Sequence, residues 1–335
     1  AQGLKFTSFA VGGGTPLILD EGQLEELFCL AELFGVHPSR VFTSVETSPE
    51  YTQKSVLRQL RARGVERLSM GVQSFNETEL KKLKRRPGLG TVVGALENIV
   101  EAGFPQFNLD LIYGIEGQTV ESFMRSLNTA LTYRPNELFI YPLYVRPGTR
   151  IDVRSTDDIG YAIYKSAREL LVGQGFVQTS MRRFVRRETT ETEFSCGDEV
   201  MLSCGAGGRS YLGNLHYATP YAVRQQAIAD EIDHYIRTTD FMTAANGFLL
   251  STEEMQIRFI IKNLMYHRGV DLAEYEKRFG EKPDRNLFRE FTDRGWIEET
   301  GRIVRLTQGM AYSDYIGQAF ISPVVRKLMS EYVYP

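Results

Sequence analysis

The stretch Ala10-Val11-Gly12-Gly13-Gly14-Thr15-Pro16 follows a short apolar run and precedes a predicted helix, so we expect it at the C-terminal end of a strand. Consecutive glycines permit backbone conformations that are closed to other residues, and they let a ligand approach the main chain closely. The amide groups of such a turn can then bind a small polar ligand. A glycine run alone is equally compatible with a flexible turn that binds nothing. The strands that follow must therefore show whether this turn belongs to a ligand site.

Strands and helices alternate through the first 150 residues. Strands are predicted at 7–11, 41–46, 67–73, 107–113 and 138–145, and helices at 21–34, 54–63, 91–102 and 119–133. We expect Asp20 and Thr119 to cap two of these helices. A strand recurring every ~30 residues, with a helix between, predicts right-handed βαβ units and a parallel sheet. The fold class is therefore α/β, with five visible strands in a parallel barrel or a doubly wound sheet.

The pattern changes after residue 150. We predict a helix at 158–172, a strand at 176–184, loops around a short strand at 188–219, and a helix at 221–235. From 251 onward the chain is predicted to be mostly helical, and two short strands near its end resemble those of a winged-helix module. These shifts divide the chain into a barrel domain at 1–150, an α+β extension at 151–245 and a helical C-terminal domain at 246–335.

Composition excludes several functional classes. The formal net charge of −3 argues against general nucleic-acid binding, because no basic field is available to attract phosphates. No apolar stretch approaches the ~18 residues of a membrane span, and no signal peptide opens the sequence. The three cysteines, Cys29, Cys196 and Cys204, do not suggest a disulfide framework, which favours a cytoplasmic location.

Polar residues stand at the predicted ends of the strands, where parallel α/β folds bind their ligands. Glu46, Gln73, Asp110 and Tyr141 occupy these ends together with the glycine turn. Each residue alone has a structural interpretation, such as capping the next helix. Asp110 is the most informative, because a carboxylate between apolar neighbours is costly unless a partner satisfies it. Together they predict a ligand that carries ammonium, hydroxyl and purine groups.

Five motifs in order carry a resemblance to a known family: GGGTP from residue 12, SVETSP from 44, RLSMGVQSFN from 67, NLDLIYGIEGQT from 108 and YPLYVRPGT from 141. They resemble those of radical S-adenosylmethionine (SAM) enzymes of the oxygen-independent coproporphyrinogen III oxidase (HemN/HemW-like) family. The resemblance continues through YKSARE from 164, QTSM from 178, CGA from 204 and RSY from 209. It implies a partial (β/α)6 barrel whose first strand would precede residue 1, with an α+β extension and a winged-helix-like C-terminal module.

The family also implies roles for individual residues. Gly12, Gly13, Gly14 and Thr15 would hold the SAM amino group. Glu46 and Gln73 would contact the amino-acid and ribose parts of SAM. Arg85 would pair with its carboxylate, and Asp110 would bind the ribose or a neighbouring polar group. Tyr141 is a further expected cofactor contact. The sequence itself, beyond the family's roles, offers candidates to face a substrate, although a surface-loop role is equally compatible: Gln178, Ser180, Arg182, Arg209 and Tyr211, with His216 and Tyr217 as further candidates.

The family's chemistry depends on a CxxxCxxC loop whose thiolates hold a 4Fe–4S cluster, and the sequence contains no such motif. We expect Cys29 in the core, on the apolar face of the first helix, and we assign no cluster role to Cys196 or Cys204, which are eight residues apart. The resemblance therefore places the cluster-binding segment upstream of Ala1, and the chain itself is expected to contribute no metal ligand.

The resemblance implies an enzyme that makes a 5′-deoxyadenosyl radical from SAM at the cluster and uses it on a tetrapyrrole, in oxidative decarboxylation or in heme ring opening. One alternative is a methyltransferase or cyclopropanase that acts on a heteroaromatic natural product with a second SAM. Another is a heme chaperone without turnover. A monomer is expected, with an electron donor such as flavodoxin or ferredoxin and no nucleic-acid or membrane partner.

Overall fold

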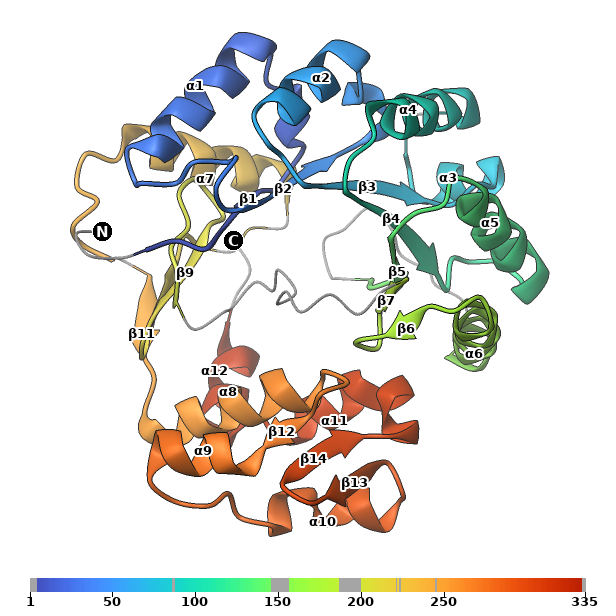
Figure 1. Ribbon diagram of the computed structural model, residues 1–335. Helices are drawn as coiled ribbons and strands as arrows, with labels where there is room; N and C mark the ends of the chain where they lie inside the picture. The colour runs from blue at the N-terminus through green and yellow to red at the C-terminus, as the bar shows by residue number, and fades with distance from the viewer. Residues whose placement is uncertain are drawn as a thin grey trace. The chain divides into compact units, whose positions relative to one another are not determined.

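The computed structural model describes residues 5–85, 88–145, 157–186, 200–220, 222, 224–244 and 246–332 (Figure 1). They form two compact units. The first takes the described residues up to 178 together with 182–186, and the second takes 179–181 and the described residues from 200 onward. Cys196, to which we assign no cluster role, lies outside the described residues, and so does the predicted domain boundary between residues 150 and 151.

A seven-stranded sheet forms the first unit, in the order β1-β2-β3-β4-β5-β7-β6. Its first five strands pair in parallel and confirm the α/β prediction. They are β1 (Ser8–Val11), β2 (Phe42–Thr47), β3 (Arg67–Gln73), β4 (Gln106–Tyr113) and β5 (Glu137–Pro142). The remaining strands, β7 (Arg183–Val185) and β6 (Val177–Gln178), continue the sheet antiparallel to β5 and to each other.

Helices alternate with these strands along the chain: α1 (Glu21–Glu32), α2 (Lys54–Ala62), α3 (Glu77–Lys82), α4 (Leu89–Ala102), α5 (Val120–Thr132) and α6 (Asp157–Gly173). Short 3-10 turns lie at Pro16–Ile18 and Pro49–Tyr51. Asp20 and Thr119 begin α1 and α5 with reciprocal capping boxes, as predicted. Gly103 ends α4 in the left-handed region, with φ 62°.

The two faces of the parallel sheet differ in chemistry. Successive side chains of a strand point to opposite faces, and one set is apolar and buried: Val45, Leu68, Met70, Leu109, Leu111, Leu138 and Ile140. Figure 1 shows α1, α2, α4 and α5 along the outer side of the strands. The alternate set is polar: Ser44, Glu46, Arg67, Ser69, Asn108, Asp110 and Glu137. A sheet covered by helices on both faces would be apolar on both, so the polar face is the one available for chemistry.

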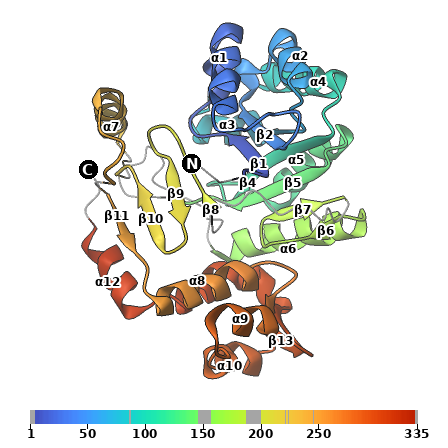
Figure 2. The ribbon, with the colours of Figure 1, turned by 60° about the vertical axis from the view of Figure 1, so that its left-hand side comes forward.

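The second unit contains a four-stranded antiparallel sheet, seen in Figure 2. Its strands are β8 (Val200–Met201), β9 (Arg209–Leu212), β10 (Leu215–Ala218) and β11 (Gly247–Leu249), with α7 (Gln225–Arg237) between β10 and β11 in sequence. The prediction of loops through residue 219 is wrong for β9 and β10, which form a hairpin around Gly213 and Asn214. Gly213 has φ 63°, and such two-residue turns favour hairpins.

The rest of this unit is a helical module with a small sheet of order β12-β14-β13. Its elements are α8 (Thr252–Leu264), β12 (Val270–Asp271), α9 (Leu272–Phe279), α10 (Asn286–Asp293), β13 (Ile297–Thr300), β14 (Ile303–Leu306), a 3-10 turn (Gln308–Tyr312), α11 (Ser313–Ala319) and α12 (Pro323–Glu331). One apolar cluster that includes Phe259, Phe291 and Ile316 fills its core. Through the described part of the chain, no helix combines the length and apolar character needed to cross a membrane.

Candidate functional site

The glycine turn after β1 is held against the carboxylate of Glu46 on β2. Gly13 N donates a hydrogen bond to Glu46 Oε2 at 3.4 Å. A Cβ added at Gly12 would lie 3.0 Å from Glu46 Cδ, so a larger residue there would displace the carboxylate. Gly13 and Gly14 have φ values of 82° and 59°, a region in which side chains are strained. The turn therefore needs glycine for two separate reasons.

Gln73 ends β3 in the left-handed region, with φ 73°, which is unusual for a residue other than glycine. Its side chain is buried and folds back over Gly71, where an added Cβ would lie 2.5 Å from Gln73 Nε2. Gly71 pairs with Asp110 of β4. The Gln73 amide is thereby placed over the strand position next to Asp110, so two of the predicted site residues come together.

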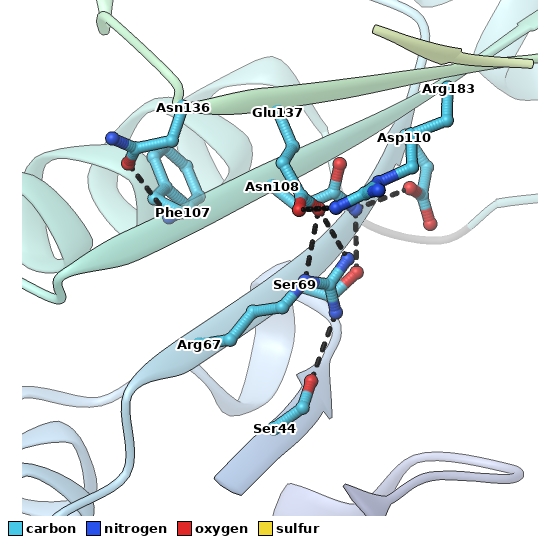
Figure 3. A network of polar contacts seen from close by, with 9 residues as sticks. All are labelled: Ser44, Arg67, Ser69, Phe107, Asn108, Asp110, Asn136, Glu137 and Arg183. Carbon is cyan, nitrogen blue, oxygen red and sulfur yellow. Dashed lines mark hydrogen bonds and ion pairs between the residues drawn. The ribbon is translucent and has the colours of Figure 1, made fainter. Parts of the chain in front are cut away.

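Asp110 carries a strongly shifted carboxyl group. Burial raises its pKa to about 6; the hydrogen bond from Asn108 and the charge of Arg67 oppose this shift, while Glu46 and Glu137 add to it. Asn108 Nδ2 donates to Asp110 Oδ1 and to Ser69 Oγ, both at 2.7 Å (Figure 3). Near pH 6 the carboxyl group is therefore able either to donate or to accept a hydrogen bond.

A buried ion network, not foreseen from the sequence, lies deeper on the same face (Figure 3). Glu137 on β5 receives Arg67 Nη2 at 2.9 Å and Nε at 3.0 Å, and it also pairs with Arg183 of β7. Arg67 Nη1 donates to Ser44 Oγ at 2.9 Å. Burial by itself would raise the pKa of Glu137, but the two guanidinium groups hold it below its ordinary value. The sequence did contain a signal for a polar face of the sheet, because polar residues occupy alternate strand positions, such as Ser44 and Glu46.

The other predicted cofactor contacts are more scattered. Tyr141 lies near the end of β5, stacked on Phe139 with 5.5 Å between ring centroids. Thr15 follows the glycine turn and is half-buried. Arg85 lies just beyond α3 with an exposed side chain. No hydrogen bond or ion pair within the described residues joins Arg85 to Glu46, Gln73 or Asp110, so its role toward a carboxylate stays a prediction.

Two predicted substrate residues belong to the first unit and are tied to protein partners. Gln178 Nε2 donates to Tyr164 Oη at 2.6 Å, and its Oε1 accepts from Arg168 Nε at 2.7 Å. Arg182 donates to Tyr144 Oη, and its guanidinium carbon lies 5.6 Å from the centre of the Tyr144 ring. These contacts fix both side chains at the β5–β7 end of the sheet.

The remaining substrate candidates belong to the second unit. Tyr211 on β9 stacks on His216 of β10, with ring centroids 4.2 Å apart. Arg258 covers the Tyr211 ring at 4.0 Å, and Phe248 meets His216 edge-on at 5.0 Å. Arg209 lies two residues before Tyr211 in the strand, so both point to this face. Tyr217 points to the opposite face, and Ser180 forms an isolated bridge with Tyr266.

His216 is the titratable centre of this aromatic stack. Burial lowers its pKa, and the positive charges of Arg258 and Arg209 lower it further. The imidazole is therefore neutral at pH 7, with a lone pair on one ring nitrogen. Its Nε2 is buried and has no hydrogen-bond partner within the described part of the chain. A neutral imidazole beside cations and aromatic rings suits a planar anionic ligand.

The described cysteines do not form a metal site. Cys29 is exposed rather than in the core, because the buried stripe of α1 runs through Leu24 and Phe28, and residue 29 lies about 100° further around the helix. Cys204 is exposed as well. In the residues that the structure describes, no group of three His, Cys, Asp or Glu side chains is placed to hold a metal ion. These residues do not fit an iron–sulfur cluster.

The sheet edge does fit the polar part of SAM. The Gly12 turn gives a ligand access to the main chain beside a carboxylate, which suits an ammonium group. Asp110 offers a carboxyl group that can hydrogen-bond a hydroxyl. Asn108 Oδ1 is a buried acceptor that receives no hydrogen bond from the described residues, and buried polar atoms in native proteins rarely stay unsatisfied.

Known proteins resemble this chain in sequence and in fold. The model of the radical SAM superfamily matches residues 2–130. Heme chaperone HemW of Bacillus subtilis is 27% identical over 334 residues, covering 93% of this chain and 84% of that protein. Oxygen-independent coproporphyrinogen III oxidase of Salmonella typhimurium is 35% identical over 292 residues, covering 80% of this chain and 62% of that protein.

The solved structure of coproporphyrinogen III oxidase (HemN) from Escherichia coli matches with a TM-score of 0.78 at 23% identity, covering 94% of this chain and 77% of that one. The likeness concerns the fold and agrees with the predicted radical SAM architecture. Members of this superfamily in general use a 4Fe–4S cluster and SAM. The motifs, the parallel sheet with its polar face and these matches lead to one conclusion: the chain is similar to the radical SAM superfamily and, within it, to HemN/HemW proteins related to coproporphyrinogen III oxidase.

Proposed function

We propose that this chain binds SAM at the C-terminal edge of its parallel sheet and belongs to an enzyme that acts on a tetrapyrrole. The observation that carries the proposal is the pair of glycine-dependent contacts at this edge: Gly12 beneath the Glu46 carboxylate, and Gly71 beneath the Gln73 amide. In both cases the absence of a Cβ leaves a polar side chain lying against the main chain. Such close approach is a common reason for glycine at a ligand site.

Different residues at the C-terminal ends of the strands would bind different parts of SAM. The Gly12–Gly14 turn and Glu46 would receive the ammonium group of SAM, and Gln73 and Asp110 would receive ribose hydroxyls. In this family SAM supplies a 5′-deoxyadenosyl radical that removes a hydrogen atom from the substrate. The described residues hold no cluster ligands, so we assign them to binding and orientation only.

The substrate proposal rests on the aromatic stack of the second unit. Arg209 and Arg258 offer guanidinium groups that pair with carboxylates in a bidentate manner, as porphyrin propionates would require. His216 and Phe248 offer ring surfaces for a macrocycle, and Tyr211, which stacks on His216 and lies under Arg258, supports them. The names of the relatives, coproporphyrinogen III oxidase and heme chaperone, point to the same class of ligand. We infer oxidative decarboxylation or heme ring opening as the reaction.

A heme chaperone is the second candidate. The Bacillus relative of that name is matched over 84% of its length, whereas the Salmonella oxidase is matched over 62%. On this alternative the aromatic stack would hold heme for transfer, and the SAM site would serve binding without turnover.

One experiment separates the candidates. The full-length protein is reconstituted with iron and sulfide without oxygen and is incubated with SAM, a reductant, and heme or coproporphyrinogen III. Substrate-dependent 5′-deoxyadenosine together with a changed tetrapyrrole mass is the expected result. Bound but unchanged heme with little 5′-deoxyadenosine would favour the chaperone. SAM consumption with neither tetrapyrrole bound would overturn the substrate proposal and favour the methyltransferase alternative.

A further inference from the structure

Glu79 on α3 is a buried carboxylate whose surroundings contain only neutral donors. Its side chain accepts hydrogen bonds from Ser74 Oγ at 2.6 Å, Ser122 Oγ at 2.7 Å and Gln118 Nε2 at 2.9 Å. The residue is 4% exposed, and no ion pair reaches it within the described residues. Burying a carboxylate is costly unless hydrogen bonds satisfy it, so a residue of this kind needs a reason to be there.

The three donors come from the loops that follow β3 and β4 and from the start of α5. Ser74 directly follows Gln73, and Gln118 lies between β4 and α5. Gln118 Oε1 in turn accepts from Gly114 N at 2.8 Å and from Ile115 N at 3.4 Å, just past the end of β4. Glu79 is therefore the common acceptor that joins the loop after Gln73 to the loop after the Asp110 strand.

The loop after β3 needs such support. Gln73 has φ 73°, and a non-glycine residue in this region persists only where its surroundings over-determine it. Ser74 Oγ donates to Glu79 while accepting from Asn76 N at 2.9 Å. Phe75 N donates to Ser126 Oγ of α5 at 3.1 Å. Each residue from 74 to 76 is thus connected to Glu79 or to α5 through one or two hydrogen bonds.

We propose that Glu79 is a positioning residue, which holds the loops after β3 and β4 so that Gln73 and Asp110 share one ligand. The inference rests on the proposed SAM binding at this edge. Glu79 itself lies behind the loops and does not touch the ligand. Its effect is to keep the strained Gln73 conformation populated before the ligand arrives, which lowers the cost of binding.

A polarity exchange tests this assignment. In Glu79→Gln one of the two carboxylate oxygens becomes an NH2 group, so the contact with Gln118 or the one with Ser122 loses its acceptor, and the remaining donors no longer meet a charge. The double variant Glu79→Gln with Gln118→Glu restores a donor and an acceptor between positions 79 and 118 without changing side-chain size. Glu77→Gln is the matched control, because Glu77 lies on the same helix with an exposed side chain.

Three quantities are measured on the full-length protein: hydrogen exchange of the segments 73–76 and 114–118 without ligand, the SAM dissociation constant by equilibrium dialysis, and the free energy of unfolding. We expect Glu79→Gln to speed exchange in both segments and to raise the dissociation constant about tenfold, the effect of about one lost hydrogen bond. The double variant recovers both quantities, and Glu77→Gln changes neither.

Unchanged exchange in Glu79→Gln would overturn the inference, as would a wild-type SAM affinity in a variant whose loops exchange faster. A double variant as impaired as the single one would refute the hydrogen-bond assignment. Failure of the wild-type protein itself to bind SAM would instead refute the proposed function and, with it, the SAM-positioning role, while the exchange data would still decide whether Glu79 holds the loops.

Discussion

The amide of Gln73 lies over Gly71 so closely that a Cβ added at Gly71 would stand 2.5 Å from Gln73 Nε2. We predict that Gly71→Ala weakens SAM binding about tenfold while changing the unfolding free energy by less than about 1 kcal/mol, because the clash is with the end of a flexible side chain. Titration calorimetry and urea unfolding measure the two quantities. Gly94→Ala is the control: it lies in α4 with open space around it and should leave SAM binding unchanged.

Asp110 should make stability depend on pH in a defined direction. Its folded pKa of about 6 is above the ordinary value of 3.8, so only well below pH 3.8 is the carboxyl group protonated in both the folded and the unfolded protein. As the pH rises from about 4 to about 6, the unfolded protein loses this proton first, and wild type loses stability. Asp110→Asn should therefore equal wild type at about pH 3 and exceed it at about pH 7.5, as measured by urea unfolding. The same variant should bind SAM more weakly; equal stability at both pH values would contradict the assignment.

Glu137 should be essential to the first unit. Replacing it by Gln leaves Arg67 and Arg183 buried opposite a neutral group, and breaking a buried ion pair in this way costs about 3–5 kcal/mol. Guanidinium chloride unfolding provides the measurement. Glu101→Gln is the matched control, because the Lys54–Glu101 pair is also short, at 2.6 Å, but lies in solvent. If both variants lost a similarly small amount of unfolding free energy, the ion network of Arg67, Glu137 and Arg183 would contribute little to stability.

His216 should contribute to binding of a tetrapyrrole, on the proposed function. We expect His216→Phe to preserve the ring stack with Tyr211 while weakening heme binding about tenfold, because the neutral imidazole nitrogen is lost. Absorbance titration with heme measures the change. His234→Phe on α7 is the control, since His234 is exposed. Unchanged heme affinity in His216→Phe would remove this residue from the proposed site.

The sequence predicted the local features well, because their causes are local. The capping residues Asp20 and Thr119 and the five parallel strands follow from periodicity and from residues close in the chain. Asp110, expected at a strand end, lies inside β4, three residues before its end at Tyr113. The position of Gln73 at a strand end was predictable, but its left-handed backbone was not, because that conformation depends on contacts with Ser74 and the loops behind it.

The long-range features could not be predicted in the same way. Glu137 is separated from Arg67 by 70 residues and from Arg183 by 46, so strand alternation shows polar positions without showing which of them meet. The exposure of Cys29 depends on where the edge of the buried stripe of α1 falls, because each helix position is turned by about 100° from the one before it. The β9–β10 hairpin, by contrast, is local, and its two-residue Gly213-Asn214 turn was an available signal that the surrounding stretch of small polar residues obscured.

The ion pair between Arg67 and Glu137 also specifies how the strands are allowed to align. Because side chains alternate between faces, a shift of β3 by one residue would move Arg67 into the apolar layer beneath the helices and bring Leu68 to the polar face. Such a misaligned sheet would bury the unpaired charge of Arg67 on β3 and would remove one of the two guanidinium partners of Glu137 on β5. The network thus penalises incorrect alignment of β3, which carries Gln73, and of β5, which flanks the Asp110 strand β4. An error of one residue at either strand would disassemble the site.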